Sequence, residues 1–80
     1  MNKSIIGLHA EADRLRRFSL GRAGGTWRRM YDYSEWRLVT VAVDEEEREL
    51  SVVLDSPLDT RHETIVVKLR DFHDTFKSID

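Results

Sequence analysis

The sequence contains no cysteine, and this absence excludes two kinds of stabilisation. Disulfides cannot form, and a zinc site built on thiolates is ruled out. A chain of 80 residues buries only about 60% of the surface that its unfolded state exposes, so its stability is marginal. We expect one domain over residues 1–80, with no bound cofactor.

Long apolar runs are also missing from the sequence. No stretch approaches the roughly 20 apolar residues that a transmembrane helix needs. Near the N-terminus, His9, Glu11 and Asp13 interrupt the apolar residues, and a secretory signal peptide would not contain such charges in its apolar region. We therefore expect a soluble, cytoplasmic protein without a membrane partner.

The sequence has no recognisable catalytic or metal-binding pattern. His9, His62 and His73 are scattered, and they provide no set of three ligands at a known spacing. No serine or threonine lies in a nucleophile motif. The acidic run 44–49 lacks the Asp-x-Asp-x-Asp-Gly pattern of a calcium loop. We predict neither an enzyme nor a metalloprotein.

Charge is distributed unevenly along the chain, although the net charge is only −2. Residues 1–40 hold eight Lys/Arg and four Asp/Glu, which gives +4. Residues 41–80 hold five Lys/Arg and eleven Asp/Glu, which gives −6. Such asymmetry indicates either charged partners or pairing between the two halves, and it carries no information about the fold.

The clearest structural pattern lies in residues 36–54, where two runs of apolar residues alternate with other residues. The alternating residues are Val39, Val41 and Val43 in the first run and Leu50, Val52 and Leu54 in the second. A period of two with β-branched residues is typical of half-buried strands. Keeping all six on one face predicts an antiparallel hairpin with a loop over 45–48 and with Val39 opposite Leu54.

Helices are predicted at both ends of the chain. Apolar residues at spacings of three and four predict an amphipathic helix from Ser4, its N-cap, to Leu20. A second, short helix over 72–79 is predicted, with Asp71 as its N-cap and with Phe72 and Phe76 on one face.

Two further strands complete the predicted fold. Residues 63–70 alternate like a strand. Residues 27–33 fit neither period, and we interpret them as a short strand with a turn over residues 33–35, with an irregular lid over the sheet as the alternative. The fold class is α+β: a small two-layer domain with an N-terminal helix, an antiparallel three- to four-strand meander and a short C-terminal helix. The predicted core is Leu8, Ala12, Leu15, Phe18, Val39, Val41, Val43, Leu50, Val52, Leu54, Ile65, Val67, Leu69, Phe72 and Phe76.

Residues 14–37 combine arginines with aromatic residues. Seven arginines and two acidic residues give this stretch a local charge of +5. Guanidinium groups bind phosphates and aromatic rings stack on bases, so the stretch is a candidate nucleic-acid site. The residues proposed for this alternative are Arg14, Arg16, Arg17, Arg22, Arg28 and Arg29. In the other interpretation, these arginines solvate a helix face or pair with the acidic half.

The same composition suits a protein partner, because Trp, Tyr and Arg are enriched at binding hot spots. The acidic loop could orient a basic partner, or it could simply be a solvated hairpin tip. The candidate partner-binding residues are Trp27, Arg28, Arg29, Tyr31, Tyr33, Glu45, Glu46 and Glu47. The leading hypothesis is a non-enzymatic protein-binding module, similar in character to small phage- or plasmid-type inhibitors and regulators, that blocks a partner sterically. Open sheet edges also predict a homodimer.

Overall fold

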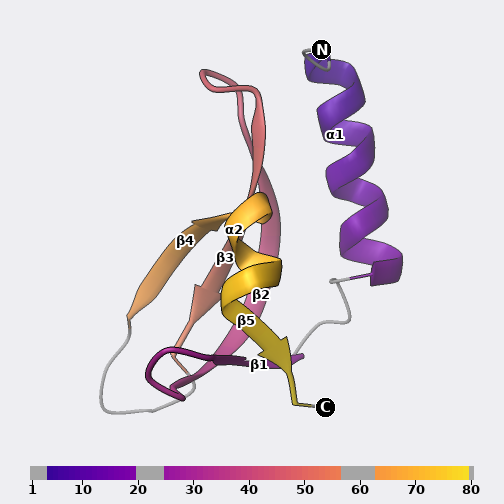
Figure 1. Cartoon of the computed structure of the whole chain (residues 1–80). Helices are drawn as coiled ribbons and strands as arrows, with labels where there is room; N and C mark the ends of the chain where they lie inside the picture. Colours follow the sequence, from indigo (N-terminus) through magenta and orange to yellow (C-terminus); the bar gives the residue numbers. More distant parts are fainter. Residues whose placement is uncertain (1–3, 20–24, 57–62, 80) are drawn as a thin grey trace.

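The computed structural model describes residues 4–19, 25–56 and 63–79 (Figure 1). Its elements are α1 (Ile5–Arg14), the π-helical turn η1 (Leu15–Ser19), β1 (Thr26–Arg29), β2 (Glu35–Asp44), β3 (Glu49–Asp55), β4 (Thr64–Lys68), α2 (Leu69–Thr75) and β5 (Phe76–Ser78). The strands form one antiparallel five-stranded sheet in the order β4-β3-β2-β1-β5. The predicted α+β class is confirmed, but the sheet has five strands rather than three to four.

The N-terminal helix begins where the sequence predicts. The Ser4 hydroxyl accepts a hydrogen bond from the Gly7 N–H at 3.1 Å, as an N-cap does. Leu8 and Ala12 are buried on the face that packs against the sheet. The chain then remains helical through η1. The predicted end of the helix at Leu20, and the side chain of Phe18, lie outside the described residues.

The central hairpin forms as predicted between β2 and β3. Val43 pairs with Leu50 and Val41 pairs with Val52, in the expected antiparallel register. The connecting loop occupies residues 45–48, as expected. Val41 and Val52 are fully buried, so the alternating pattern does identify the face that the core uses.

A β-bulge changes the register in the first half of β2. The pairing shifts between Leu38 and Thr40, and Leu38 rather than Val39 lies opposite Leu54. Val39 is 55% exposed, so its predicted place in the core was wrong. The extra residue of a bulge inverts the alternation, and it turns Leu38 and Trp36 inward instead. Both of these residues are buried in the structure.

Strand β1 is shorter than the predicted strand over 27–33. It ends at Arg29, and the chain then turns before β2 begins at Glu35. Tyr33 has a positive φ of 61°, which is incompatible with an extended strand. We call residues Met30–Ser34 the aromatic turn.

The C-terminal segment differs from the predicted helix over 72–79. Helix α2 begins after Lys68, which occupies the N-cap position instead of Asp71, and it ends before Phe76. The chain continues as β5, which pairs with β1. Phe72 and Phe76 stack at 5.1 Å between ring centroids. The spacing of four thus reflects a shared core contact, which a helix followed by a strand also provides.

The two faces of the sheet differ in what covers them. Both helices pack on the inner face, where the buried residues form one cluster: Leu8, Ala12, Trp36, Leu38, Val41, Leu50, Val52, Leu54, Phe72 and Phe76. On the outer face, the directly paired residues Thr40, Val53 and Val66 form a row across three strands. Val66 is 65% exposed, because no described element covers this face.

The aromatic turn as a candidate binding site

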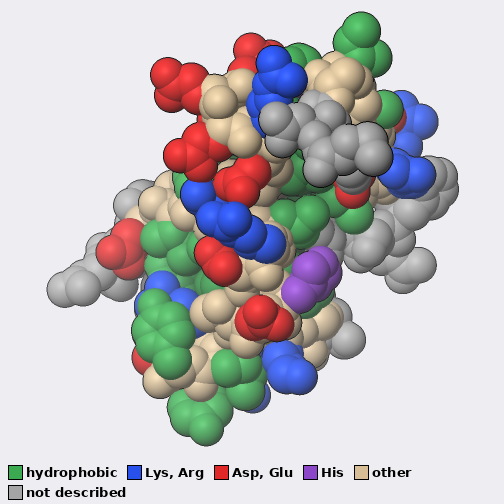
Figure 2. All heavy atoms as spheres, turned by 45° about the horizontal axis from the view of Figure 1, so that its top comes forward, with side chains coloured by type: hydrophobic (Ala, Val, Ile, Leu, Met, Phe, Trp, Pro, Cys, Tyr) green, Lys and Arg blue, Asp and Glu red, His purple; other side chains and the backbone are tan. Residues whose placement is uncertain are grey.

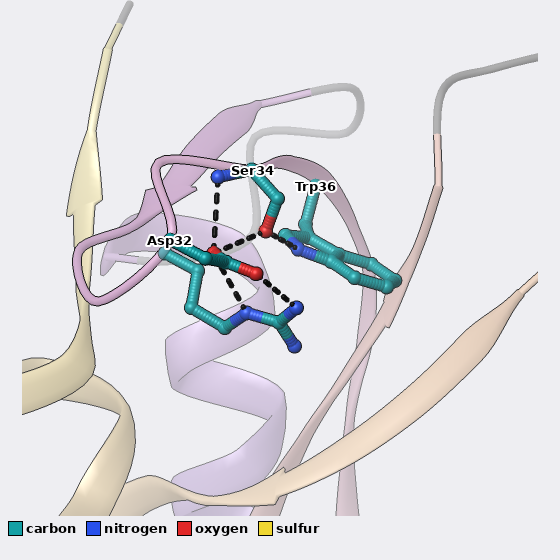
Figure 3. Close-up of polar contacts among 4 residues, drawn as sticks. Asp32, Ser34 and Trp36 are labelled. Atoms are coloured by element: carbon teal, nitrogen blue, oxygen red, sulfur yellow. Dashed lines mark hydrogen bonds and ion pairs between the residues drawn. The ribbon is translucent and has the colours of Figure 1, made fainter.

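A chain of hydrogen bonds fixes the aromatic turn from inside (Figure 3). Arg29, at the end of β1, donates from Nε to Asp32 Oδ1 at 3.2 Å and from Nη2 to Asp32 Oδ2 at 2.7 Å. Asp32 Oδ1 also accepts from the Ser34 N–H at 3.1 Å and from the Ser34 hydroxyl at 2.7 Å. The Ser34 hydroxyl in turn accepts from the indole N–H of Trp36 at 2.8 Å. The buried Trp36 thereby anchors the turn to the core.

Backbone hydrogen bonds hold the same turn at its base. The Arg29 N–H donates to the Ser34 carbonyl at 2.8 Å, and the Tyr33 N–H donates to the Arg29 carbonyl at 2.7 Å. The Met30 N–H donates to the carbonyl of Thr75, at the end of α2, at 2.8 Å. The left-handed backbone of Tyr33 costs about 1–3 kcal/mol, and these bonds offset that cost. The turn therefore has one well-defined shape.

The electrostatics of the turn leave Arg29 little freedom to contact a partner. The hydrogen bonds from Arg29, followed by those from the Ser34 side chain and backbone, hold the pKa of the Asp32 carboxyl far below its usual range. The guanidinium lies 4.7 Å from the ring centroid of Tyr31 and 4.9 Å from that of Trp36, within the range of cation–π contacts. With only 19% of its side chain exposed, Arg29 supports the turn from below.

The residues that the turn presents to solvent are apolar and aromatic. Tyr31 is 72% exposed, Tyr33 is 69% exposed and Met30 is 36% exposed. Figure 2 shows hydrophobic side chains (green) gathered at the lower end of the molecule, the end where this turn lies in Figure 1. Trp27, in contrast, packs inward, with its ring 4.7 Å from that of Phe72. Of the predicted aromatic site residues, the structure thus displays the two tyrosines.

The loop 45–48, which we call the acidic tip, is tied to other elements of the protein. Glu45 lies 3.2 Å from His9 Nε2 on α1. Glu47 lies 2.8 Å from Lys68 Nζ at the end of β4, and this contact is the main cause that raises the pKa of Lys68. Glu46 is exposed and has no ion pair among the described residues. The tip is a braced hairpin end that remains negatively charged.

The aromatic turn and the acidic tip lie at opposite ends of β2 (Figure 1). This strand has ten residues, which span about 30 Å when extended. The predicted partner-binding residues therefore divide into two separate surfaces. A partner that contacts both would have to span the whole length of the sheet.

The arginines proposed for nucleic-acid binding do not gather on one surface. Three have partners within the protein: Arg16 with the Val41 carbonyl at 2.9 Å, Arg17 with Asp13 at 3.3 Å and Arg29 with Asp32 at 2.7 Å. Arg14 is exposed on α1, on the inner side of the sheet. The side chain of Arg28 lies on the outer face of β1, because its neighbours Trp27 and Arg29 lie on the inner face and side chains alternate along a strand. Arg22 lies outside the described residues.

Sequence reasoning overlooked the support beneath the tyrosines. It placed Ser34 in a turn over residues 33–35 but named no hydrogen-bond partner for it, it gave Asp32 no role, and it left Trp36 out of the predicted core. A local signal was present, because Asp32-Tyr33-Ser34, directly after Tyr31, is an Asp-x-Ser sequence typical of an Asx turn, in which the carboxylate accepts from the backbone N–H two residues on. Reading that signal would have placed a tight turn at residues 30–34.

Comparison with known proteins does not indicate a function for this chain. Its sequence matches no protein-family model, and comparison with curated proteins and with solved structures found no similar protein. Within the described ranges, no three His, Asp or Glu side chains gather in a geometry that could hold a metal ion. None of the described helices is long and apolar enough to cross a lipid bilayer.

Proposed function

We propose that this protein is a non-enzymatic protein-binding module that docks through the aromatic turn. The observation that carries the proposal is the exposure of Tyr31 and Tyr33, at 72% and 69%, on a turn that internal hydrogen bonds hold in one shape. Tyrosine supplies a large contact area with few rotatable bonds, and it is enriched at interface hot spots. A preformed turn also lowers the ordering cost of binding.

The partner chemistry follows from what the turn offers. Two phenol rings and the Met30 thioether suit apolar pockets rimmed by hydrogen-bond acceptors for the phenol hydroxyls. A turn at the end of a sheet can enter a concave surface and occupy it against other ligands. The activity that we propose is therefore steric, as in a small inhibitor or regulator that blocks its partner's surface.

The acidic tip has a separate role in this proposal. Its carboxylates lie about 30 Å from the tyrosines, so they do not share a pocket with them. Charges at that distance act through steering, which raises the rate of association with a basic partner and orients the encounter. We expect changes at Glu46 to alter the association rate and its salt dependence, while the dissociation rate stays unchanged.

Site-specific crosslinking tests the docking surface directly. A photoreactive phenylalanine derivative replaces Tyr31 in one variant and Ile6 in another; Ile6 is 83% exposed on α1, far from the turn in sequence. We expect a crosslinked protein partner from position 31 and none from position 6. With that partner purified, Tyr31→Ala and Tyr33→Ala should each weaken binding at least about tenfold, mainly through faster dissociation. Equal crosslinking at both positions would contradict the proposal.

A salt titration separates this function from nucleic-acid binding. A phosphate binder loses about one decade of affinity per contacted phosphate for each decade of salt. We expect fluorescence anisotropy with a single-stranded oligonucleotide to show no binding tighter than the roughly 1 μM limit of non-specific association. Tight binding that is steep in salt and lost in an Arg14→Glu, Arg28→Glu variant would favour the nucleic-acid alternative instead.

A further inference from the structure

The sheet protects some of its edges against pairing with other strands. The edge strand β5 is only three residues long. The part of β2 that does not pair with β1 is also an open edge. Along this part, Arg16 Nε donates to the Val41 carbonyl at 2.9 Å, and the bulge at Val39 distorts the strand. Short strands, bulges and basic side chains along an edge are the devices that prevent edge-to-edge association.

Strand β4 forms the other edge and has none of these devices along its middle residues. Its pairing with β3 is regular from Thr64 to Lys68, without a bulge or a proline. Its three central residues are β-branched. The Lys68 ammonium is drawn toward Glu47 at 2.8 Å and Glu49 at 3.2 Å, so it does not guard the open edge. Within the described ranges, no other strand pairs with this edge.

The hydrogen bonds of β4 show which groups face the open edge. The Ser56 N–H donates to the Glu63 carbonyl at 2.9 Å, which makes these opposite residues a hydrogen-bonded pair. Bonded and non-bonded pairs alternate along an antiparallel ladder. The odd-numbered residues of β4 therefore bond to β3, whereas Thr64 and Val66 turn their N–H and C=O groups outward. These groups form a template for one more strand.

We propose that β4 is a self-association edge, on which two copies of this chain pair antiparallel with Val66 on the two-fold axis. The Val66 N–H of each copy then donates to the carbonyl of Val66 of the partner subunit. In this register Thr64 faces Lys68 of the partner subunit, and a ten-stranded sheet results. The aromatic turn, which joins β1 and β2, stays free in such a dimer, so this inference does not depend on the proposed function.

Charge and apolar surface both favour a second copy as the added strand. Glu63 precedes β4 and Arg70 follows it, so an antiparallel copy brings Glu63 of each chain near Arg70 of the partner subunit. The Arg70 side chain remains 66% exposed although it also contacts Glu49 within its own chain. In the dimer, the outer-face row of Thr40, Val53 and Val66 continues into the same row of the second copy, which places the two Val66 side chains next to each other. This contact covers a valine that is 65% exposed in the single chain.

Sedimentation equilibrium with two matched variants tests the edge. A five-residue strand buries less than a stable interface does, so we expect a dissociation constant of roughly 100 μM. Val66→Lys places like charges against each other on the axis and should weaken dimerisation at least about tenfold. Val39→Lys changes another exposed valine away from this edge and should leave it unchanged. Equal losses in both variants would indicate stacking of the sheet faces and would overturn the proposal.

Amide hydrogen exchange on the unmodified protein provides a second test. We expect the amides of Thr64 and Val66 to exchange more slowly as protein concentration rises from about 10 μM to about 1 mM, because pairing occupies them in the dimer. The Val67 amide bonds to β3 in either state and serves as the internal control. The proposal would be overturned if the chain remained monomeric over this range, or if the exchange rate of the Val66 amide did not depend on protein concentration.

Discussion

The Arg29 guanidinium and the Asp32 carboxylate meet through two hydrogen bonds, one from Nε at 3.2 Å and one from Nη2 at 2.7 Å. Such paired bonds fix the relative orientation of both side chains. Because Asp32 also accepts two bonds from Ser34, its negative charge connects the end of β1 to the start of β2. The shape of the aromatic turn therefore depends on the ionisation of one carboxyl group.

Acid should loosen the aromatic turn only at a pH well below the ordinary range of aspartate side chains. The folded state lowers the pKa of Asp32, so the stabilisation is fully present above the ordinary aspartate pKa of about 3.9 and is lost as the pH falls from there through the lowered pKa of the folded state. We expect the fluorescence of Trp36, whose indole donates to Ser34, to change in this acidic range. Titration of the Asp32 carboxyl by nuclear magnetic resonance measures the pKa directly.

The control for this experiment is Asp32→Asn, which keeps the size of the side chain and removes its charge. We expect the variant to have a more mobile turn at neutral pH and to lose the acid-dependent change attributed to Asp32. A variant whose Trp36 signal still follows the parent between neutral and acidic pH would assign the change to another carboxyl group.

The bulge in β2 predicts opposite outcomes for two valines that are two residues apart. Val41→Asp buries an unpaired charge, which costs several kcal/mol against a total stability of about 5–10 kcal/mol, so this variant should be unfolded. Val39→Asp places its carboxylate in solvent and should change stability by less than about 1 kcal/mol. Thermal unfolding followed by circular dichroism distinguishes them. Equal melting temperatures would mean that the bulge is absent in solution.

The aromatic cluster around Phe72 should be the most sensitive part of the C-terminal segment. Phe72 is fully buried and contacts the rings of Trp27 at 4.7 Å and Phe76 at 5.1 Å. Phe72→Ala should cost about 3–5 kcal/mol. Ile6→Ala, at an 83% exposed position, should stay within about 0.5 kcal/mol of the parent. Urea unfolding curves measure both values, and a loss below about 1 kcal/mol for Phe72→Ala would contradict the packing.

The sequence predicts those parts of the fold that depend on local patterns. The Ser4 cap, the register of Val41 with Val52 and the four-residue hairpin loop all follow from neighbouring residues. The bulge does not, because one extra residue reverses which side chains face inward while the run remains rich in valine. For that reason Leu38 lies in the core position that the pattern assigns to Val39.

Long-range pairing explains the other differences from the sequence-based expectations. The spacing of Phe72 and Phe76 is equally compatible with a continuous helix, and only the proximity of β1 selects a strand from Phe76 onward. In the same way, the composition of residues 14–37 suggests one arginine surface. The structure directs Arg16 to a β2 carbonyl and Arg29 to Asp32, which no spacing rule reveals.

The pairing of β1 with β5 has a consequence for how the chain folds during synthesis. Arg29 lies opposite Phe76, and the Met30 amide donates to Thr75, although more than half of the chain separates these residues. A nascent chain emerges from its N-terminus, and contacts of high sequence separation form late. The tyrosines thus leave the ribosome long before the segment that braces them. The aromatic turn is complete only after residues 75–78 have emerged, because a shorter chain lacks both the acceptor for the Met30 amide and the strand that pairs with β1.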